Sequence, residues 1–572
     1  FDGIGAILTG ANFTNADVRS ANFSGYSGTG ITLPQLYSTA SYQAHDLTGI
    51  NLAGRNLAGG DFSGQNLTLA NLAYATLTGA DFTGAVVRGG SFGGYYDYNT
   101  NTLVGGISLP QLYSTASYQV RDLSGIQLDG LDLSNADLSG QNLTNASLGA
   151  LTGANLTGAE VRGASLGVTP AQLYTTASYQ AHDLSGIGLG GDLTGVNLAG
   201  QNLTNARLSA TLTGADFTGA VIRGAQLSTA NGFTAAQLYS TASYQSHELN
   251  GVDFTQGDLS GWSFAGQNLA GASFYYAILQ GTDFSHAKLA NANLDSAELI
   301  SADLSHAVIT NATLYNANIW NANLTGADTR GPGGGFYNFS NVVTTNLIHA
   351  DGRIDGLNLG AGQLLVVRDY DGKANDNFGN PFPPVAISIQ EHLTMTPGGT
   401  LRMEFEVDAW DSTISFAAGI LVTLGGTLEL TFADDVELAS QIGRTFDLFD
   451  WTGVSPTGAF TVNSPYVWDL SNLYSSGDVT LTALVAALTG DFNNDGSVDA
   501  ADYVAWRRND GTQAGYDSWR ANFGRTLAAG SGSALPSAEP WPGAVPEAAS
   551  ILLAALGALS MTAFGQRRRR SC

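Results

Sequence analysis

Large apolar residues recur at every fifth position along two long stretches of the chain. The first stretch runs through Leu47, Leu52, Leu57, Phe62, Leu67, Leu72, Leu77, Phe82, Val87 and Phe92. The second keeps the same phase from Leu249 to Leu324, and a small residue often stands two positions earlier, as at Ala272 and Ala292. A period of five matches neither an α-helix nor a β-strand. The pattern therefore indicates a repeat architecture.

Each five-residue unit offers one large and one small side chain to an interior. If each unit turns the chain by roughly a right angle, four units close a coil, and coils stack at about 4.8 Å, the spacing of β-strands. The segments ADFTG, ANLTG and SADLS resemble the pentapeptide-repeat family over residues 1–330. This resemblance implies a mainly β fold, a right-handed quadrilateral β-helix. Three shortened steps are expected to be local corner distortions: Leu148 to Leu151, Leu189 to Leu193 and Leu208 to Leu212.

A nine-residue phrase is copied almost without change. QLYSTASYQ begins at residues 35, 111 and 237, and QLYTTASYQ begins at residue 172. A Ser or Thr precedes each copy by three residues, which is the spacing of a capping box at a helix start. We therefore predict one helix of about ten residues per copy. These helices form inserts near 33–43, 109–119, 170–180 and 235–245.

The copied phrase has two interpretations. In the first, the insert ends one stack of coils and begins the next, and ten inward positions separate successive copies. In the second, the insert is a recognition knob whose tyrosines, such as Tyr37 and Tyr42, face a partner. The capping pattern favours the structural interpretation.

The period of five stops after residue 330. Residues 331–488 carry β-branched runs separated by Gly, Pro and Asp, which is typical of strands. They predict a β-rich domain, either a β-sandwich or a continuing β-solenoid. Within the repeats, His286 and His306 are twenty residues apart, so they are expected to stack on adjacent coils, but a third metal ligand is not evident.

Residues 489–526 open with DFNNDGSVDAAD, which matches a calcium-binding loop. The predicted Ca²⁺ ligands are Asp491, Asn493, Asp495, Ser497, Asp499 and Asp502. With the helix expected after it, the segment is similar to the dockerin family, whose members pair two calcium loops and bind cohesin modules. Its second half lacks the alternating acids. The resemblance therefore implies calcium for one loop, and a cohesin-type partner is left open.

The C-terminal end combines three features. A linker over 527–545 is followed by Pro546-Glu547, an apolar run over 548–564 and four arginines, Arg567, Arg568, Arg569 and Arg570. This order resembles the PEP-CTERM sorting signal that exosortases process, although Ala548 departs from its third position. We expect 546–572 to be a sorting signal with a transmembrane helix. Arginines held on the cytoplasmic side would place everything upstream outside.

Charge and cysteine content narrow the classes of function. Asp and Glu number 48 against 22 Lys and Arg, so the formal charge is −26, which disfavours binding to nucleic-acid phosphates or anionic lipid. The single cysteine, Cys572, excludes an intramolecular disulfide and a Cys-rich zinc site. The chain opens with Phe1 rather than Met, so we expect a fragment or a processed form. No nucleophilic motif is evident, and an enzyme is not expected.

These features together predict a non-enzymatic, exported protein anchored at the bacterial cell surface, with a structural or adhesion role. The expected partners are calcium, a protein or glycan at the cell surface, an exosortase-type enzyme and the membrane, and no nucleic acid. Two alternatives are left open. One is an acidic inhibitor that mimics DNA, as some pentapeptide-repeat proteins do, and the other is a β-helical enzyme acting on polysaccharide.

Overall fold

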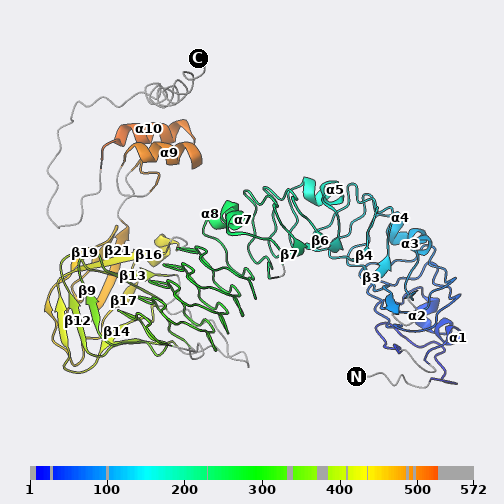
Figure 1. The fold of residues 1–572 in the computed structure, drawn as a ribbon, viewed down its shortest axis with the longest axis horizontal. Coiled ribbons are helices and arrows are strands. Elements are labelled where there is room, and N and C mark those ends of the chain that lie inside the picture. The colour runs from blue at the N-terminus through cyan, green and yellow to red at the C-terminus, as the bar shows by residue number, and fades with distance from the viewer. Residues whose placement is uncertain are drawn as a thin grey trace, which may run out of the picture. The chain divides into compact units, whose positions relative to one another are not determined.

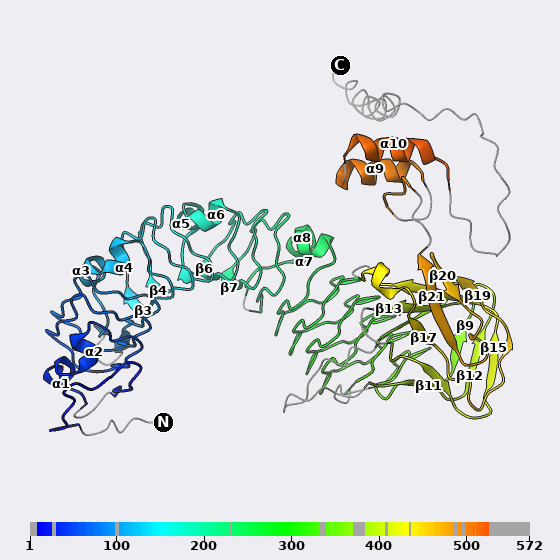
Figure 2. The same cartoon turned by 180° about the vertical axis from the view of Figure 1, so that it is seen from behind.

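The computed structural model describes residues 8–25, 30–97, 102–228, 230–331, 339–369, 384–406, 410–433, 436–484, 489–493, 498–509 and 511–525. The chain divides into two compact units. Unit 1 comprises Phe1–Arg353 and Asp371–Val385, and unit 2 comprises Ile354–Tyr370 and Ala386–Cys572. Figure 1 and the reverse view in Figure 2 show that stacked coils dominate each unit.

Unit 1 is a stack of four-sided coils. Backbone bridges join residues twenty apart, as in Asn51 with Asn71 and Asp283 with Asp303, so four five-residue units make one coil. Every large apolar residue expected to point inward between Leu47 and Phe92, and between Leu249 and Leu324, is at most 5% exposed. The predicted period and the predicted interior are both confirmed.

The interior is a column of large side chains lying one above another. Phe264 stacks on Phe284 with ring centroids 5.3 Å apart, and Phe62 stacks on Phe82 at the same distance. The corners use two local devices. The Oδ1 of Asp61 accepts the backbone N–H of Ser63 across the turn, as Asx residues do. The last corner position is left-handed, with φ of 59° at Asn291, which explains its Gly and Asn content.

The copied phrase forms two short helices rather than the single helix of about ten residues that we predicted. The eight helices are α1 (Leu33–Tyr37), α2 (Ala40–Gln43), α3 (Leu109–Ser114), α4 (Ala116–Gln119), α5 (Pro170–Tyr174), α6 (Ala177–Gln180), α7 (Ala235–Ser240) and α8 (Ala242–Gln245). The break has a local cause. Thr39 is extended, with ψ of 149°, and its hydroxyl accepts the N–H of Tyr42, so it caps a second helix inside the phrase.

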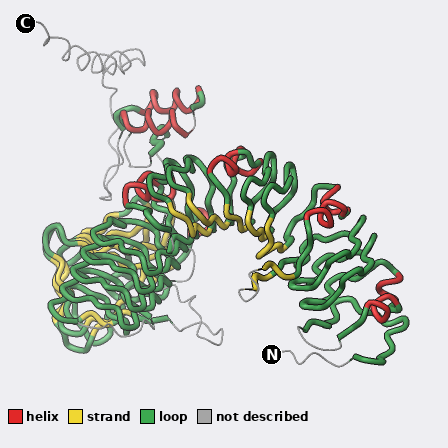
Figure 3. The backbone as a smooth tube through the Cα atoms, turned by 45° about the vertical axis from the view of Figure 1, so that its right-hand side comes forward, coloured by secondary structure: helices red, strands yellow, loops and turns green. Residues whose placement is uncertain are grey.

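The strands of unit 1 form one hairpin and one parallel sheet. A hairpin pairs β1 (Tyr95–Asp97) with β2 (Thr102–Val104). A parallel sheet follows in the order β3 (Gln127–Asp132), β4 (Ser147–Ala150), β5 (Ser165–Gly167), β6 (Gly188–Asp192) and β7 (Arg207–Thr211). The three shortened steps fall in β4, β6 and β7. The ladder register is irregular between Ser147 and Ala150 of β4, a local distortion of the kind expected at these steps. In Figure 3 the helices follow one edge of the stack and this sheet follows another.

Unit 2 contains parallel coils of three strands, which matches the solenoid alternative and not a sandwich. One sheet has the order β10 (Leu364–Arg368), β13 (Thr400–Phe405), β16 (Thr427–Phe432) and β19 (Thr461–Asn463). A second has β18 (Thr457–Gly458), β15 (Leu421–Leu424), β12 (His392–Met395) and β9 (Leu357–Leu359). A third pairs β11 (Ile387–Ile389) with β14 (Ile414–Phe416). β8 (Arg353–Ile354) lies where the two units meet in the sequence.

The remaining elements of unit 2 follow the coils. A short η1 (Leu438–Gln441) precedes an antiparallel sheet in the order β17 (Thr445–Asp447), β21 (Asp478–Leu484) and β20 (Tyr466–Asp469). Two helices then pack together, α9 (Ala500–Asn509) and α10 (Gln513–Asn522), with the rings of Tyr503 and Trp519 5.0 Å apart.

None of the helices within the described residues is both long and apolar enough to cross a membrane. The expected linker over 527–545 and the expected sorting signal and anchor over 546–572 lie outside the described residues.

Candidate functional site

The four inserts occupy the same column of the solenoid, where a column is the stack of equivalent positions on one of the four sides of the coils. In this column Asp61 bridges Asp81, Asp137 bridges Asn155, Asn197 bridges Asp216, and Ser263 bridges Asp283. Between these pairs an insert takes the place of the ladder residue. The column on the opposite side of the coils runs unbroken through Asn51, Asn71, Ser91 and Gln127. One insert therefore returns every third coil, about 14 Å apart at the usual strand spacing.

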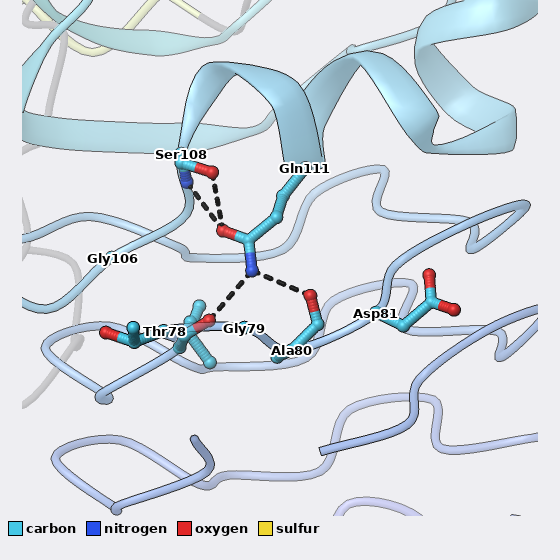
Figure 4. Close-up of a pocket in the computed structure, with 8 residues that line it drawn as sticks. Thr78, Gly79, Ala80, Asp81, Gly106, Ser108 and Gln111 are labelled. Atoms are coloured by element: carbon cyan, nitrogen blue, oxygen red, sulfur yellow. Dashed lines mark hydrogen bonds between the residues drawn. The ribbon is translucent and has the colours of Figure 1, made fainter. Parts of the chain in front are cut away.

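A glutamine joins each insert to the coil before it. The Oε1 of Gln111 accepts the backbone N–H of Ser108 at 2.9 Å and its hydroxyl at 2.8 Å, which completes the capping box. Its Nε2 donates to the carbonyls of Leu77 and Ala80, each at 2.8 Å. Figure 4 shows these bonds at one end of an open hollow lined by residues 77–81, Gly106, Ser108 and Gln111. Gln35, Gln172 and Gln237 make the same two contacts with their own preceding coils.

A buried serine makes the second link to the coil before. The Oγ of Ser117 accepts the backbone N–H of Val87 at 2.9 Å, and Ser117 is 2% exposed. Its counterparts Ser41, Ser178 and Ser243 bond Val18, Val161 and Ile222 in the same way. A side chain therefore supplies the acceptor that a neighbouring coil would otherwise provide.

The paired tyrosines join each insert to the coil after it. The Oη of Tyr113 accepts the N–H of Asp137 at 2.9 Å, while the Oη of Tyr118 donates to the carbonyl of Asp137 at 2.7 Å. The two rings lie 4.6 Å apart. The other three pairs bracket Asp61, Asn197 and Ser263 identically. Burial and the charge of Asp61 raise the pKa of Tyr42 to about 12, so this hydroxyl stays protonated and can donate.

These contacts decide between the two interpretations of the copied phrase. The hydroxyls of both tyrosines are engaged by the next coil, and the glutamine and serine are engaged by the preceding one. An ion pair between Arg88 and Asp122, 3.1 Å apart, adds a bridge from one side of an insert to the other. The phrase is a structural junction that replaces a missing ladder segment, and the hydroxyls of its tyrosines are used within the stack.

The stacked histidines are present, and no third metal ligand joins them within the described residues. The rings of His286 and His306 are 4.9 Å apart and nearly parallel, as the twenty-residue spacing predicts. Burial and the neighbouring His286 lower the pKa of His306. Within the described residues, no three His, Cys, Asp or Glu side chains come together closely enough to hold a metal.

The predicted calcium loop is described only in part. Asp495 and Ser497 lie outside the described residues, whereas Asp491, Asn493, Asp499 and Asp502 lie within them. Asp502 is fully buried, and its carboxylate accepts the backbone N–H groups of Phe492, Asn493 and Asp499 at 2.7, 3.0 and 2.8 Å. The described parts of the loop on either side thus meet at its last acid. The donor set proposed for the ion consists only of oxygen atoms, which fits Ca²⁺.

The C-terminal end of the loop is also bonded to the C-terminal end of the α9 and α10 segment. Val498 donates to the carbonyl of Arg525 and accepts from Gly524, each at 2.7 Å, and the indole of Trp519 donates to the carbonyl of Asp499 at 2.6 Å. These bonds hold the two ends of the α9 and α10 segment together. The sorting-signal residues Pro546, Glu547, Arg567, Arg568, Arg569 and Arg570 lie outside the described residues.

Comparisons with known proteins find a family match in the repeats. The family model described as pentapeptide repeats matches in eight copies, at residues 2–25, 46–84, 122–149, 192–231, 248–285, 277–314 and 292–328. One similar solved structure is a pentapeptide-repeat protein from the thylakoid lumen of Arabidopsis thaliana. It is 35% identical over 16% of this chain, with a TM-score of 0.12, and the match spans 59% of that protein.

Two further solved structures are similar over a longer range. HetL, involved in heterocyst differentiation regulation in Nostoc sp. strain PCC 7120, is 23% identical over 52% of this chain and 96% of its own, with a TM-score of 0.14. QnrB1, a plasmid-mediated fluoroquinolone resistance protein, is 14% identical over 52% and 89%, with a TM-score of 0.12. No curated protein matches the sequence. The matched segments and the coils of four five-residue units together show that unit 1 is built from pentapeptide repeats.

Proposed function

We propose that the protein is a non-catalytic, exported binding protein that displays a continuous pentapeptide-repeat solenoid at the cell surface. The observation that supports this proposal most is the use of the copied Gln, Ser and Tyr side chains in hydrogen bonds between coils. Such junctions keep the stack continuous through each insert. A solenoid of this kind presents an extended surface rather than one enclosed cleft. We therefore propose a role in structural display or in adhesion to a protein or glycan partner.

Export and anchoring rest on the sequence of 546–572. Its apolar run and the four arginines Arg567–Arg570 would hold the C-terminal end at the membrane, with an exosortase-type enzyme as the processing partner. We expect cell fractionation to recover the chain in the envelope fraction. Replacing the four arginines with serine is expected to shift it out of that fraction. Full-length wild-type chain found mainly in the cytosol would contradict export.

The calcium loop is expected to order the α9 and α10 segment. A bacterial exterior with calcium in the range of about 10⁻⁴ to 10⁻³ M would fill even a weak loop. Calcium added to the full chain should therefore release heat and slow proteolysis within 489–525, and Asp491→Ala should abolish both effects.

Asp517→Asn provides the matched control, because it removes an acid of α10 that bonds Gln513 outside the loop. This variant should respond to calcium as the wild type does. No heat and unchanged proteolysis of the wild type on adding calcium would exclude the site.

The DNA-mimicking alternative remains the second candidate function. Asp61 Oδ1 accepts the N–H of Ser63, and Asn71 Oδ1 accepts that of Ala73 in the same way. Asp and Asn therefore perform one turn-forming role, whereas mimicry of a phosphate backbone needs charge at regular intervals. Inhibition of DNA supercoiling by stoichiometric full-length chain would favour that alternative, and we expect none.

A further inference from the structure

Several exposed aromatic and apolar side chains gather late in the repeats of unit 1. Tyr275, Ile278, Tyr315 and Trp320 are 39%, 44%, 63% and 42% exposed, although they belong to coils whose interiors are fully buried. The inward period of five does not account for them, because all four occupy outward positions.

The coil register places these side chains next to each other. Ile278 bridges Glu298, which bridges Asn318. The bonds from Tyr276 N to the carbonyl of Asp295, and from Ser296 N to that of Tyr315, put Tyr275, Asp295 and Tyr315 at one corner of three successive coils. Two further backbone bonds run from Gly281 N to the carbonyl of Ile300 and from Ser301 N to the carbonyl of Trp320. They put Gln280, Ile300 and Trp320 at the next corner. Aromatic corners thus flank a strip that carries Glu298.

Two carboxylates are held in position between the rings. Asp295 Oδ1 accepts the backbone N–H of Tyr315 at 2.7 Å, and Glu298 Oε2 accepts the Nδ2 of Asn318 at 2.8 Å. Asp258 precedes Ile278 in the same ladder, so three acids lie along this side. Partial burial, the neighbouring Tyr276 and the charge of Asp295 raise the pKa of Tyr275. The phenol is therefore a neutral ring at physiological pH.

We propose that this aromatic–acidic face (Tyr275, Ile278, Asp295, Glu298, Tyr315 and Trp320) binds a cationic, arginine- or lysine-bearing segment of a partner protein. A guanidinium or ammonium group is attracted to the face of a Tyr or Trp ring. The same group is attracted to the carboxylates, which complement its charge. An anionic partner would be repelled by a chain of net charge −26. A neutral partner would have to desolvate the carboxylates without an opposite charge in return.

The proposal rests on the proposed binding function and names its partner chemistry. Its test uses the full-length chain and a synthetic peptide of alternating glycine and arginine, compared with the same peptide containing neutral citrulline. We expect the arginine peptide to bind more tightly at physiological salt. We also expect the double variant Tyr315→Leu with Trp320→Leu to weaken it about tenfold, because leucine keeps apolar area but loses the ring.

Three further variants separate the contributions. Tyr315→Phe keeps the ring and should bind as the wild type does. Asp295→Asn with Glu298→Gln keeps both acceptor oxygens and should weaken binding by a similar factor. Asp61→Asn with Asp81→Asn removes the same net charge elsewhere in unit 1 and should have little effect. Equal binding of the citrulline peptide, or equal loss in the Asp61 and Asp81 variant, would overturn the proposal.

A neutral oligosaccharide serves as the competing ligand. If a cello-oligosaccharide, and not the arginine peptide, binds and is lost in the Tyr315 and Trp320 variant, the face takes glycan and the cationic assignment is wrong. If neither probe responds to these variants, the face is not a binding site. Recovery of the chain in the envelope fraction would then still uphold display at the cell surface, so the two failures are distinguishable.

Discussion

Replacing Phe264 with alanine is expected to lower the free energy of unfolding of the solenoid by about 3–5 kcal/mol. Phe264 is fully buried, and it stacks on Phe284 with 5.3 Å between ring centroids. The rings of Phe254 and Phe274 lie 5.8 and 5.7 Å away. Alanine would leave a cavity that the neighbouring coils cannot fill, because their backbones are fixed by the ladder. Urea unfolding of the full chain, followed by tryptophan fluorescence, measures the change.

Tyr315→Ala is the control for this variant. Tyr315 is 63% exposed, so its removal should change the free energy of unfolding by no more than about 0.5 kcal/mol. Similar losses in the two variants would mean that the column of inward rings does not stabilise the stack.

Unit 2 is expected to become less stable as pH rises from about 4 to 8, because of Asp369. This carboxyl group is 8% exposed. Burial raises its pKa to about 7, against the effect of the backbone N–H groups of Glu406 and Asp411, each 3.3 Å from one of its oxygens. The acids Glu406 and Asp411 raise the pKa further.

The direction follows from proton binding. In the unfolded chain Asp369 loses its proton near pH 4, whereas in the folded chain it keeps it until about pH 7. The folded state therefore binds the extra proton between these values. The stabilisation that this proton gives is complete below the pKa of the unfolded chain. It is lost as pH rises through about 7, which lowers the free energy of unfolding by about 4 kcal/mol.

Asp369→Asn should remove this part of the pH dependence, as measured by urea unfolding at about pH 5 and pH 8. Asp450→Asn is the control. Asp450 is exposed, its pKa is lowered by its bonds to Thr452, and its loss should leave the alkaline decrease unchanged. An equally steep decrease in the Asp369 variant would contradict the assignment.

The interior of the repeats could be predicted from the sequence because one residue in five must be large and apolar. Leu249 and every fifth residue to Leu324 are buried, with no exception. The capping box was also predictable, since the Ser or Thr and the Gln stand three residues apart. It forms in all four copies.

The break inside each insert was not predicted. The periodic apolar residues of QLYSTASYQ suit one helix, and Thr is tolerated in a helix interior. In the structure Thr39 instead accepts the N–H of Tyr42 and bonds the carbonyl of Leu36. This arrangement turns Tyr42 toward Asp61. The competing local bond of a threonine side chain thus prevails over helix propagation.

The candidate surfaces depend on contacts between coils, which the sequence pattern does not show directly. The role of Tyr113 and Tyr118 becomes apparent only when Asp137 is seen to lack a ladder neighbour on the preceding coil. The aromatic–acidic face likewise joins Tyr275 to Tyr315, forty residues apart. A search for exposed aromatic residues at multiples of twenty would have found it. All six calcium ligands, and the signal over 546–572, stay predictions.

The tyrosines of each insert replace a missing ladder segment. Native-state hydrogen exchange of the Asp137 amide tests this claim most directly, since its N–H is bonded to the Tyr113 hydroxyl. We predict protection within about tenfold of Asp81, whose N–H bonds a backbone carbonyl. We also predict faster exchange at Asp137 in Tyr113→Phe, with Asn197 unchanged as the internal control. Exchange of the wild-type Asp137 amide at the rate of an open loop, or no response to the variant, would contradict the claim.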